Sequence, residues 1–198
     1  MATTFDIYMT GVGGQGIGLL AEVLARAALH AGLAVKGCDT HGLAQRGGIV
    51  ASHLRIGAGA HSPLVEAGSA KLVVSLERHE ALRGLRSMLA RGGTLVWYDA
   101  AWQPLEVRLR RARSVGTEEV FAEARSRDVQ AFRVFVEELG DPRVQNVLLI
   151  AEIAARNLIP GTGPAQYRMA LADLLEGASL ADNLTVFEAA VARNAERG

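Results

Sequence analysis

The stretch GVGGQG at residues 11–16 constrains the fold of this chain more than any other feature, because of the segments on either side of it. A short apolar run at 5–11 precedes it, and residues 17–32 follow with apolar side chains at helical spacing. Gly32 predicts a left-handed helix end, and residues 33–39 have the composition of a strand. Because about 20 residues separate the two strands, we expect a crossover helix and parallel strands.

Strand and helix patterns keep alternating after this unit. Residues 49–57 alternate in polarity with period two, which is typical of a strand near the edge of a sheet. Residues 71–76 and 94–99 are compact apolar strands, and 77–93 between them carries leucines at helical spacing. The sequence therefore predicts an α/β fold, with a three-layer, open, mostly parallel, Rossmann-like sheet.

The remainder of the chain is mainly helical in pattern and supplies extra C-terminal helices. A further strand is expected at 107–116, and helices are expected at 117–127, 143–158, 164–177 and 180–195. The Pro/Gly-rich joint at 157–164 is followed by too few residues for an independent core. We expect one domain over residues 1–198, with 160–198 as a terminal helical extension.

The amino-acid composition argues against several classes of function. Lys+Arg and Asp+Glu are 21 each, so no basic excess favours a nucleic-acid or anionic-membrane partner. Cys38 is the only cysteine, so the chain cannot form an internal disulfide or ligate an iron-sulfur cluster alone. No window reaches the length of a membrane helix, and we expect a cytoplasmic protein that binds neither nucleic acid nor membrane.

Gly11, Gly13 and Gly16 match the G-x-G-x-x-G pattern of dinucleotide-binding loops. Small residues allow close approach of a pyrophosphate, and the free N–H groups at a helix start favour negative charge. Asp39 is placed to serve ribose hydroxyls. The other interpretation is structural, because any strand-to-helix corner benefits from glycines. Gln15 inside the turn favours a hydrogen-bonding role of its own.

A second motif resolves part of this ambiguity. THGLAQRGGIVASHLRIG (40–57) resembles the Arg-Gly-Gly segment of gamma-type subunits of 2-oxoacid:ferredoxin oxidoreductases, especially the His-Gly-x-Ala-Gln-Arg-Gly-Gly form of indolepyruvate ferredoxin oxidoreductase beta subunits. The opening GVGGQGI and the Asn-bearing PRVQNVLLIAEIAA (142–155) are also similar to that family. The resemblance covers residues 5 to about 160. Glu152 stands near a position where the family commonly has glycine, and the tail beyond 160 shows no matching motif.

The resemblance implies a subunit of a thiamine-dependent enzyme that decarboxylates a 2-oxoacid oxidatively, here indolepyruvate or another aryl pyruvate, to an acyl-CoA. Electrons pass to ferredoxin through the complex. No cofactor is expected on this chain: thiamine diphosphate, Mg²⁺ and [4Fe-4S] clusters belong to the partner subunit, and CoA is a substrate. The isolated chain is expected to be inactive, with a homodimer as one state open to it.

Two groups of residues are the candidate sites, and neither includes a catalytic or metal-ligating residue. The first is an anion- or ligand-binding loop of Gly11, Gly13, Gly14, Gln15 and Gly16. The second contacts substrate, CoA or the partner subunit through His41, Gln45, Arg46, Gly47 and Gly48. On its glycine-flanked loop, Arg46 can bind a carboxylate or phosphate with two hydrogen bonds, or it can buttress the loop or an interface.

Two alternative functions stay open at this point: a stand-alone dinucleotide-binding oxidoreductase or redox sensor, and a non-enzymatic interaction module. A cluster of Trp97, Tyr98 and Trp102 around Asp99 also has two interpretations. The aromatic rings line a pocket or interface, or they pack in the core.

Overall fold

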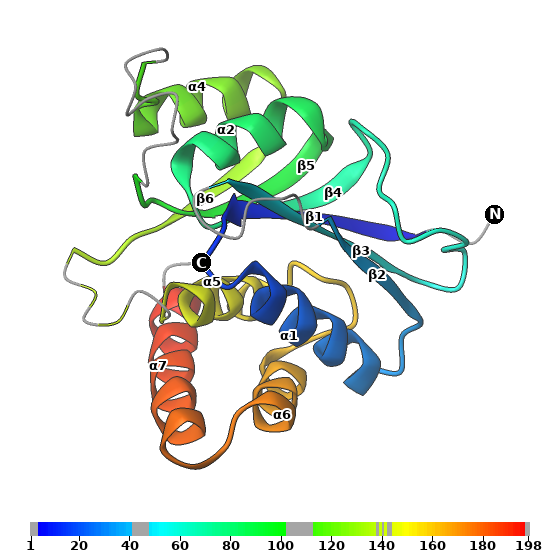
Figure 1. The fold of residues 1–198 in the computed structure, drawn as a ribbon, viewed down its shortest axis with the longest axis vertical. Helices are drawn as coiled ribbons and strands as arrows, with labels where there is room; N and C mark the ends of the chain where they lie inside the picture. The colour runs from blue at the N-terminus through cyan, green and yellow to red at the C-terminus, as the bar shows by residue number, and fades with distance from the viewer. Residues whose placement is uncertain are drawn as a thin grey trace.

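The computed structural model describes residues 4–40, 48–101, 113–137, 139, 141 and 144–196. These residues form a six-stranded sheet in the order β2-β3-β1-β4-β5-β6 (Figure 1). The strands are β1 (Phe5–Val12), β2 (Val35–Thr40), β3 (Ile49–Ile56), β4 (Ala70–Ser75), β5 (Leu89–Tyr98) and β6 (Gln130–Val134). β1, β4, β5 and β6 are neighbours in parallel, so the mostly parallel α/β sheet is confirmed.

The expected parallel pairing of the first two strands is wrong, because β3 lies between them. β3 pairs antiparallel with β1 on one side and with β2 on the other. Only eight residues separate the end of β2 from the start of β3, which is too short for a crossover between parallel strands. β1 and β2 therefore run in the same direction without touching, and β2 forms the sheet edge.

Helices cover both faces of the sheet and complete the three expected layers. α2 (Arg78–Ser87) and α4 (Thr117–Ser126) lie on one face. The opposite face carries α1 (Ile17–His30), α5 (Val144–Ala155), α6 (Pro164–Leu174) and α7 (Gly177–Ala195) (Figure 1). α6 packs on α1, and α7 packs on α5. No described helix has the length and apolarity needed to span a bilayer.

One boundary and one strand differ from expectation. The leucine spacing predicts a helical Leu89, but α2 ends at Ser87 and Leu89 begins β5, where it pairs with Ala70. The sequence pattern does not predict β6. The strand expected at 107–116 lies largely outside the described residues, and 113–116 is not part of a strand.

Two apolar clusters hold the layers together. The larger one joins β1 and β4 to α1, α5 and the terminal helices, from which Tyr167 and Phe187 contribute fully buried rings. The smaller one packs α2 and α4 against β4 and β5, with Trp97 at its centre against Phe121. Trp97 and Tyr98 are therefore core residues, whereas Trp102 lies outside the described residues.

Candidate functional site

The carboxyl ends of β1 and β4 form the point where the chain connections diverge. From β1 the chain continues into α1 on one face of the sheet, and from β4 it continues into α2 on the other (Figure 1). In open α/β sheets the crevice between two such strand ends is the usual place for a ligand. The glycine-rich loop at 11–16 lies at this point.

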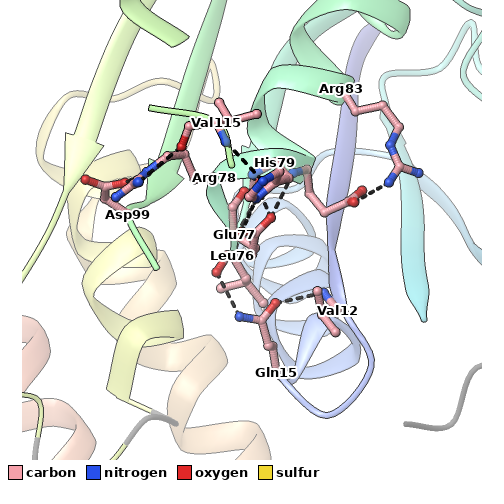
Figure 2. Close-up of polar contacts among 11 residues, drawn as sticks. Val12, Gln15, Leu76, Glu77, Arg78, His79, Arg83, Asp99 and Val115 are labelled. Atoms are coloured by element: carbon pink, nitrogen blue, oxygen red, sulfur yellow. Dashed lines mark hydrogen bonds and ion pairs between the residues drawn. The ribbon is translucent and has the colours of Figure 1, made fainter. Parts of the chain in front are cut away.

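Gln15 fills the crevice with its own side chain, as Figure 2 shows. Its Oε1 accepts a hydrogen bond from the backbone N–H of Val12 at 2.7 Å, and its Nε2 donates to the carbonyl of Leu76 at 2.9 Å. The residue is 4% exposed. One amide thereby satisfies two backbone groups at the ends of neighbouring parallel strands, which is the hydrogen-bonding role expected of it.

Gly11 leaves the room that this arrangement needs. A Cβ atom there would lie 3.0 Å from Gln15 Oε1 and 3.2 Å from Leu76 Cβ. Such contacts are tighter than van der Waals packing normally allows, so a larger residue would push the Gln15 side chain out of the crevice.

α5 supports the loop from the other side. Asn146 Nδ2 donates to the carbonyl of Gln15 at 3.0 Å, and Gln145 Nε2 lies 3.5 Å from the same oxygen. Asn146 is 1% exposed, and its Oδ1 has no hydrogen-bond partner within the part of the chain that the structure describes. Both residues lie in the first turn of α5, so the N-terminal ends of α1 and α5 approach each other at this loop.

The N-terminus of α1 has no side-chain cap. Gly16 precedes the helix in the left-handed conformation, with φ of 85°, and is exposed like Gly14. Because no side chain among the described residues satisfies the first N–H groups of the helix, the helix dipole and these groups favour an anion there. These are the properties that an anion-binding loop requires.

The structure joins the two sequence motifs through one hydrogen bond. Gly13 N donates to the carbonyl of Gly48 at 2.8 Å, which places the end of the second motif against the glycine-rich loop. The other four residues of that candidate group lie outside the described residues; they are His41, Gln45, Arg46 and Gly47. Their assigned contacts stay predictions.

A group of buried polar residues, not anticipated from the sequence, begins beside Leu76. Glu77 caps α2 by accepting from the N–H groups of His79 and Glu80, and its other oxygen lies 2.9 Å from His79 Nδ1. His79 Nε2 accepts from Val115 N at 3.1 Å (Figure 2), so Nδ1 carries the proton and donates to Glu77. The sequence did contain a signal for this helix cap, because the acidic residue Glu77 directly follows a buried strand and precedes a helical pattern.

Glu80 is a second buried carboxyl in this group. It is 1% exposed, accepts from Thr10 Oγ1 at 3.1 Å and pairs with Arg83. Burial raises the pKa of Glu80 above its ordinary value of 4.5, because the effect of desolvation exceeds the opposing effects of Arg83 and Thr10. The folded protein therefore holds this proton to a higher pH than the unfolded chain does.

We expect Glu80→Gln to change how stability depends on pH. Above about pH 4.5, increasing pH favours ionisation of Glu80 in the unfolded chain before the folded state, which lowers wild-type stability. Gln cannot ionise, so the stability of the variant relative to wild type should increase from pH 4 to pH 8. Urea unfolding across this range measures the difference. The exposed Glu118→Gln is the control, and a difference from wild type that does not change with pH contradicts the assignment.

Asp99 is a third buried carboxyl residue at the N-terminus of α2. It is 2% exposed and accepts from Arg78 and Arg133, each at 2.5 Å, and from Thr117 at 3.0 Å. Burial alone would raise the pKa of Asp99, but the hydrogen bonds from Arg78 and Arg133 outweigh it and lower the pKa below its ordinary value. The ionised carboxylate thus ties α2, α4 and β6 together.

Among the described residues, the side chains do not form a donor set that suits a metal ion or an iron-sulfur cluster. Within the described part of the chain, no three His, Cys, Asp or Glu residues are grouped closely enough to hold a metal ion. Cys38 is the single thiol of the sequence, and a cubane cluster requires several.

Fold and site together define an α/β protein with a glycine-rich loop at the switch point of its sheet. Residues 6–193 match the pyruvate ferredoxin/flavodoxin oxidoreductase family, and the chain belongs to this family. The resemblance inferred from GVGGQGI and THGLAQRGG is thereby confirmed.

Curated relatives agree with this assignment. "Indolepyruvate oxidoreductase subunit IorB" of Archaeoglobus fulgidus is 49% identical over 78 residues, which are 39% of this chain and 38% of that protein. Three further archaeal relatives with the same description match at 36–40% identity, and the alignments span only 38–57% of the four proteins.

The fold matches over nearly its full length. The gamma subunit of a keto/oxoacid ferredoxin oxidoreductase from Geobacter sulfurreducens superimposes with a TM-score of 0.65 at 18% identity, covering 98% of this chain and 99% of that one. A 2-oxoglutarate:ferredoxin oxidoreductase from Magnetococcus marinus, solved with 2-oxoglutarate, coenzyme A and succinyl-CoA bound, gives 0.65 at 16% identity, covering 98% of this chain and 31% of that one.

Proposed function

We propose that this chain is the gamma-type subunit of a cytoplasmic 2-oxoacid:ferredoxin oxidoreductase that converts indolepyruvate or another aryl pyruvate to an acyl-CoA. The family match over residues 6–193 carries the proposal. The shared description of the four curated relatives favours indolepyruvate among the 2-oxoacids. Residues 1–198 act as a single gamma-type domain, with 160–198 as its terminal helical extension.

In this proposal the prosthetic groups lie on a catalytic partner subunit. Thiamine diphosphate, Mg²⁺ and [4Fe-4S] clusters are bound there, CoA is a substrate, and ferredoxin accepts electrons from the assembled complex. The single cysteine and the lack of a metal-binding group among the described residues support this division. The present chain contributes shape and binding groups at the partner's active site.

The glycine-rich loop is the proposed anion- or ligand-binding element, and the second motif is the proposed contact with substrate, CoA or the partner subunit. One observation supports the first assignment: no side chain among the described residues caps the start of α1. The hydrogen bond from Gly13 to Gly48 supports a common role for the two motifs.

Phosphate is the probe for this loop. Titration of the ¹⁵N-labelled chain with phosphate should shift the amide signals of Ile17 and Gly18, because these N–H groups begin α1 without a side-chain cap. The amides at the start of α4 serve as the control, since Glu118 and Glu119 stand in its first turn and repel an anion. Equal shifts at both helix starts would argue against a dedicated site.

A stand-alone dinucleotide enzyme is the competing proposal, and two contacts weigh against it. Gln15 occupies the crevice in which a dinucleotide would lie, and Asp39 Oδ1 accepts a hydrogen bond from Ser52 at 2.5 Å. Micromolar binding of NAD, NADP or FAD by calorimetry would favour the competitor.

The isolated chain is expected to be colourless and inactive toward indolepyruvate and other 2-oxoacids. The reason is its donor set: one cysteine cannot ligate an iron-sulfur cluster. An absorbance spectrum and an assay with ferredoxin test the prediction, and the same chain co-purified with its thiamine-binding partner is the control. A broad cluster band near roughly 400 nm in the isolated chain would refute it.

A further inference from the structure

β6 is an edge strand of the sheet, and the main-chain groups on its outer side pair with no other strand of the described residues. It ends the sheet beside β5, and no described strand pairs with its other side. The carbonyl of Val134 accepts from Asp99 N at 2.9 Å, so Val134 directs its main-chain groups toward β5. Because these directions alternate along a strand, Ala131 and Arg133 direct their N–H and C=O groups outward.

A groove of about 360 Å³ follows this edge and is lined from both faces of the sheet. Phe121 lines it from the α4 side and Phe132 from the α5 side, and Phe135 also lines it. Phe135, directly after β6, is half exposed. The edge therefore combines open main-chain groups with apolar side chains, which is what an added strand requires.

Arginines flank the edge and define the charge of its occupant. Arg133 packs over the Phe135 ring and Arg156 over the Phe132 ring, while Arg193 reaches the groove from the end of α7. Asp99 and Glu152 pair with the first two. No described residue pairs with Arg193, so a positive charge is left at the rim of the groove.

We propose that β6 receives an extended, acidic segment of the catalytic partner subunit as a seventh strand. The segment hydrogen-bonds to the outward groups of Ala131 and Arg133, and one of its carboxylates pairs with Arg193. A second copy of this chain would bring like charges together across a two-fold axis, which disfavours self-association at this edge. The proposal rests on the proposed function, because the partner is the catalytic subunit.

Two variants of the full chain test the strand addition in binding to the purified catalytic subunit. Ala131→Pro removes one outward N–H, and an edge strand tolerates proline where the N–H faces away from its neighbour. Arg193→Glu reverses the exposed charge on α7. Each should weaken the complex at least tenfold, whereas Lys71→Glu, an exposed reversal on β4, should leave Kd unchanged. Amide exchange at Ala131 and Arg133 should slow in the wild-type complex.

Unchanged affinity of both variants, or unchanged exchange at these two amides, overturns the proposal. If Ala131→Pro weakens binding and Arg193→Glu does not, the segment is not acidic. If the wild-type chain forms a homodimer that Ala131→Pro dissociates, the strand added to β6 comes from a second copy of this chain and not from the catalytic subunit. If Ala131→Pro fails to fold, Arg193→Glu and the exchange measurement decide. A wild-type chain that does not bind the catalytic subunit refutes the proposed function itself, which separates the two failures.

Discussion

Asp99→Ala is expected to lower the free energy of unfolding by about 3 kcal/mol, the largest single effect that we anticipate on stability. The substitution leaves Arg78 and Arg133 without their shared carboxylate and Thr117 without its acceptor. We expect the lower end of the range for broken buried ion pairs because the two arginine side chains are 19% and 39% exposed.

Urea unfolding at neutral pH measures this loss, with the exposed Asp182→Ala as the control. Because the pKa of Asp99 is lowered in the folded state, the stabilisation is present above its ordinary value of 3.8 and is lost as the pH falls through the folded-state pKa. The two proteins should therefore converge in stability in acid. A loss under about 1 kcal/mol at neutral pH would show that the network is not a main support of the fold.

Gly16→Ala is expected to cause the second large loss of stability, because the substitution has two separate physical costs. Gly16 has φ of 85°, a conformation that costs an L-residue roughly 1–2 kcal/mol. A Cβ atom would also lie 2.6 Å from Asn146 Nδ2 and would displace the hydrogen bond to the Gln15 carbonyl. We expect about 2–3 kcal/mol of lost stability from the two costs together, and at least tenfold lower turnover in the assembled enzyme.

Alanine substitutions at two neighbouring glycines distinguish the conformational cost from the cost of the contact with Asn146. Gly14 has φ of 99°, but a Cβ atom added there would meet no other atom within 4 Å, so Gly14→Ala carries conformational strain alone. Gly18 lies inside α1 with the same open space and no positive φ, so Gly18→Ala should be neutral or stabilising. Thermal unfolding should rank the losses Gly16, then Gly14, then Gly18. Equal losses at Gly14 and Gly16 would show that the contact with Asn146 is unimportant.

Local sequence patterns were sufficient to predict those helices and strands whose signals lie within one continuous segment of the chain. The apolar run of β1, the glycines and the helical spacing of α1 are contiguous, and the left-handed Gly32 ended the helix as expected, with φ of 73°. The place of β3 was not accessible in this way, because strand order depends on pairing between distant segments. The short connection from β2 was the available clue.

β6 and the start of β5 escaped prediction for different reasons. β6 has only five residues, QAFRV, and as an edge strand it is half-buried without a long apolar run. Leu89 continues the leucine spacing of α2, yet α2 ends at Ser87 and Leu89 enters the core from β5. Periodicity alone could not distinguish these two environments.

The candidate site was predictable in its loop but not in its supports. A polar residue inside a glycine turn favoured a hydrogen-bonding role for Gln15, and both its partners belong to strand ends. Asn146 was visible only as part of the late helix of the resemblance, and its contact with the loop spans 131 positions. Glu80 and Thr10 meet across 70 positions, which no local pattern encodes.

Reconstitution of the complex tests most directly whether this chain is a required subunit of a 2-oxoacid:ferredoxin oxidoreductase. The purified chain is combined with the thiamine-binding catalytic subunit from the same source, and ferredoxin reduction is followed with indolepyruvate and CoA. We predict little or no turnover by either protein alone and substrate- and CoA-dependent turnover by the mixture, which Gly16→Ala should reduce at least tenfold. Full activity of the catalytic subunit by itself, unchanged by addition of this chain, would contradict the proposed function.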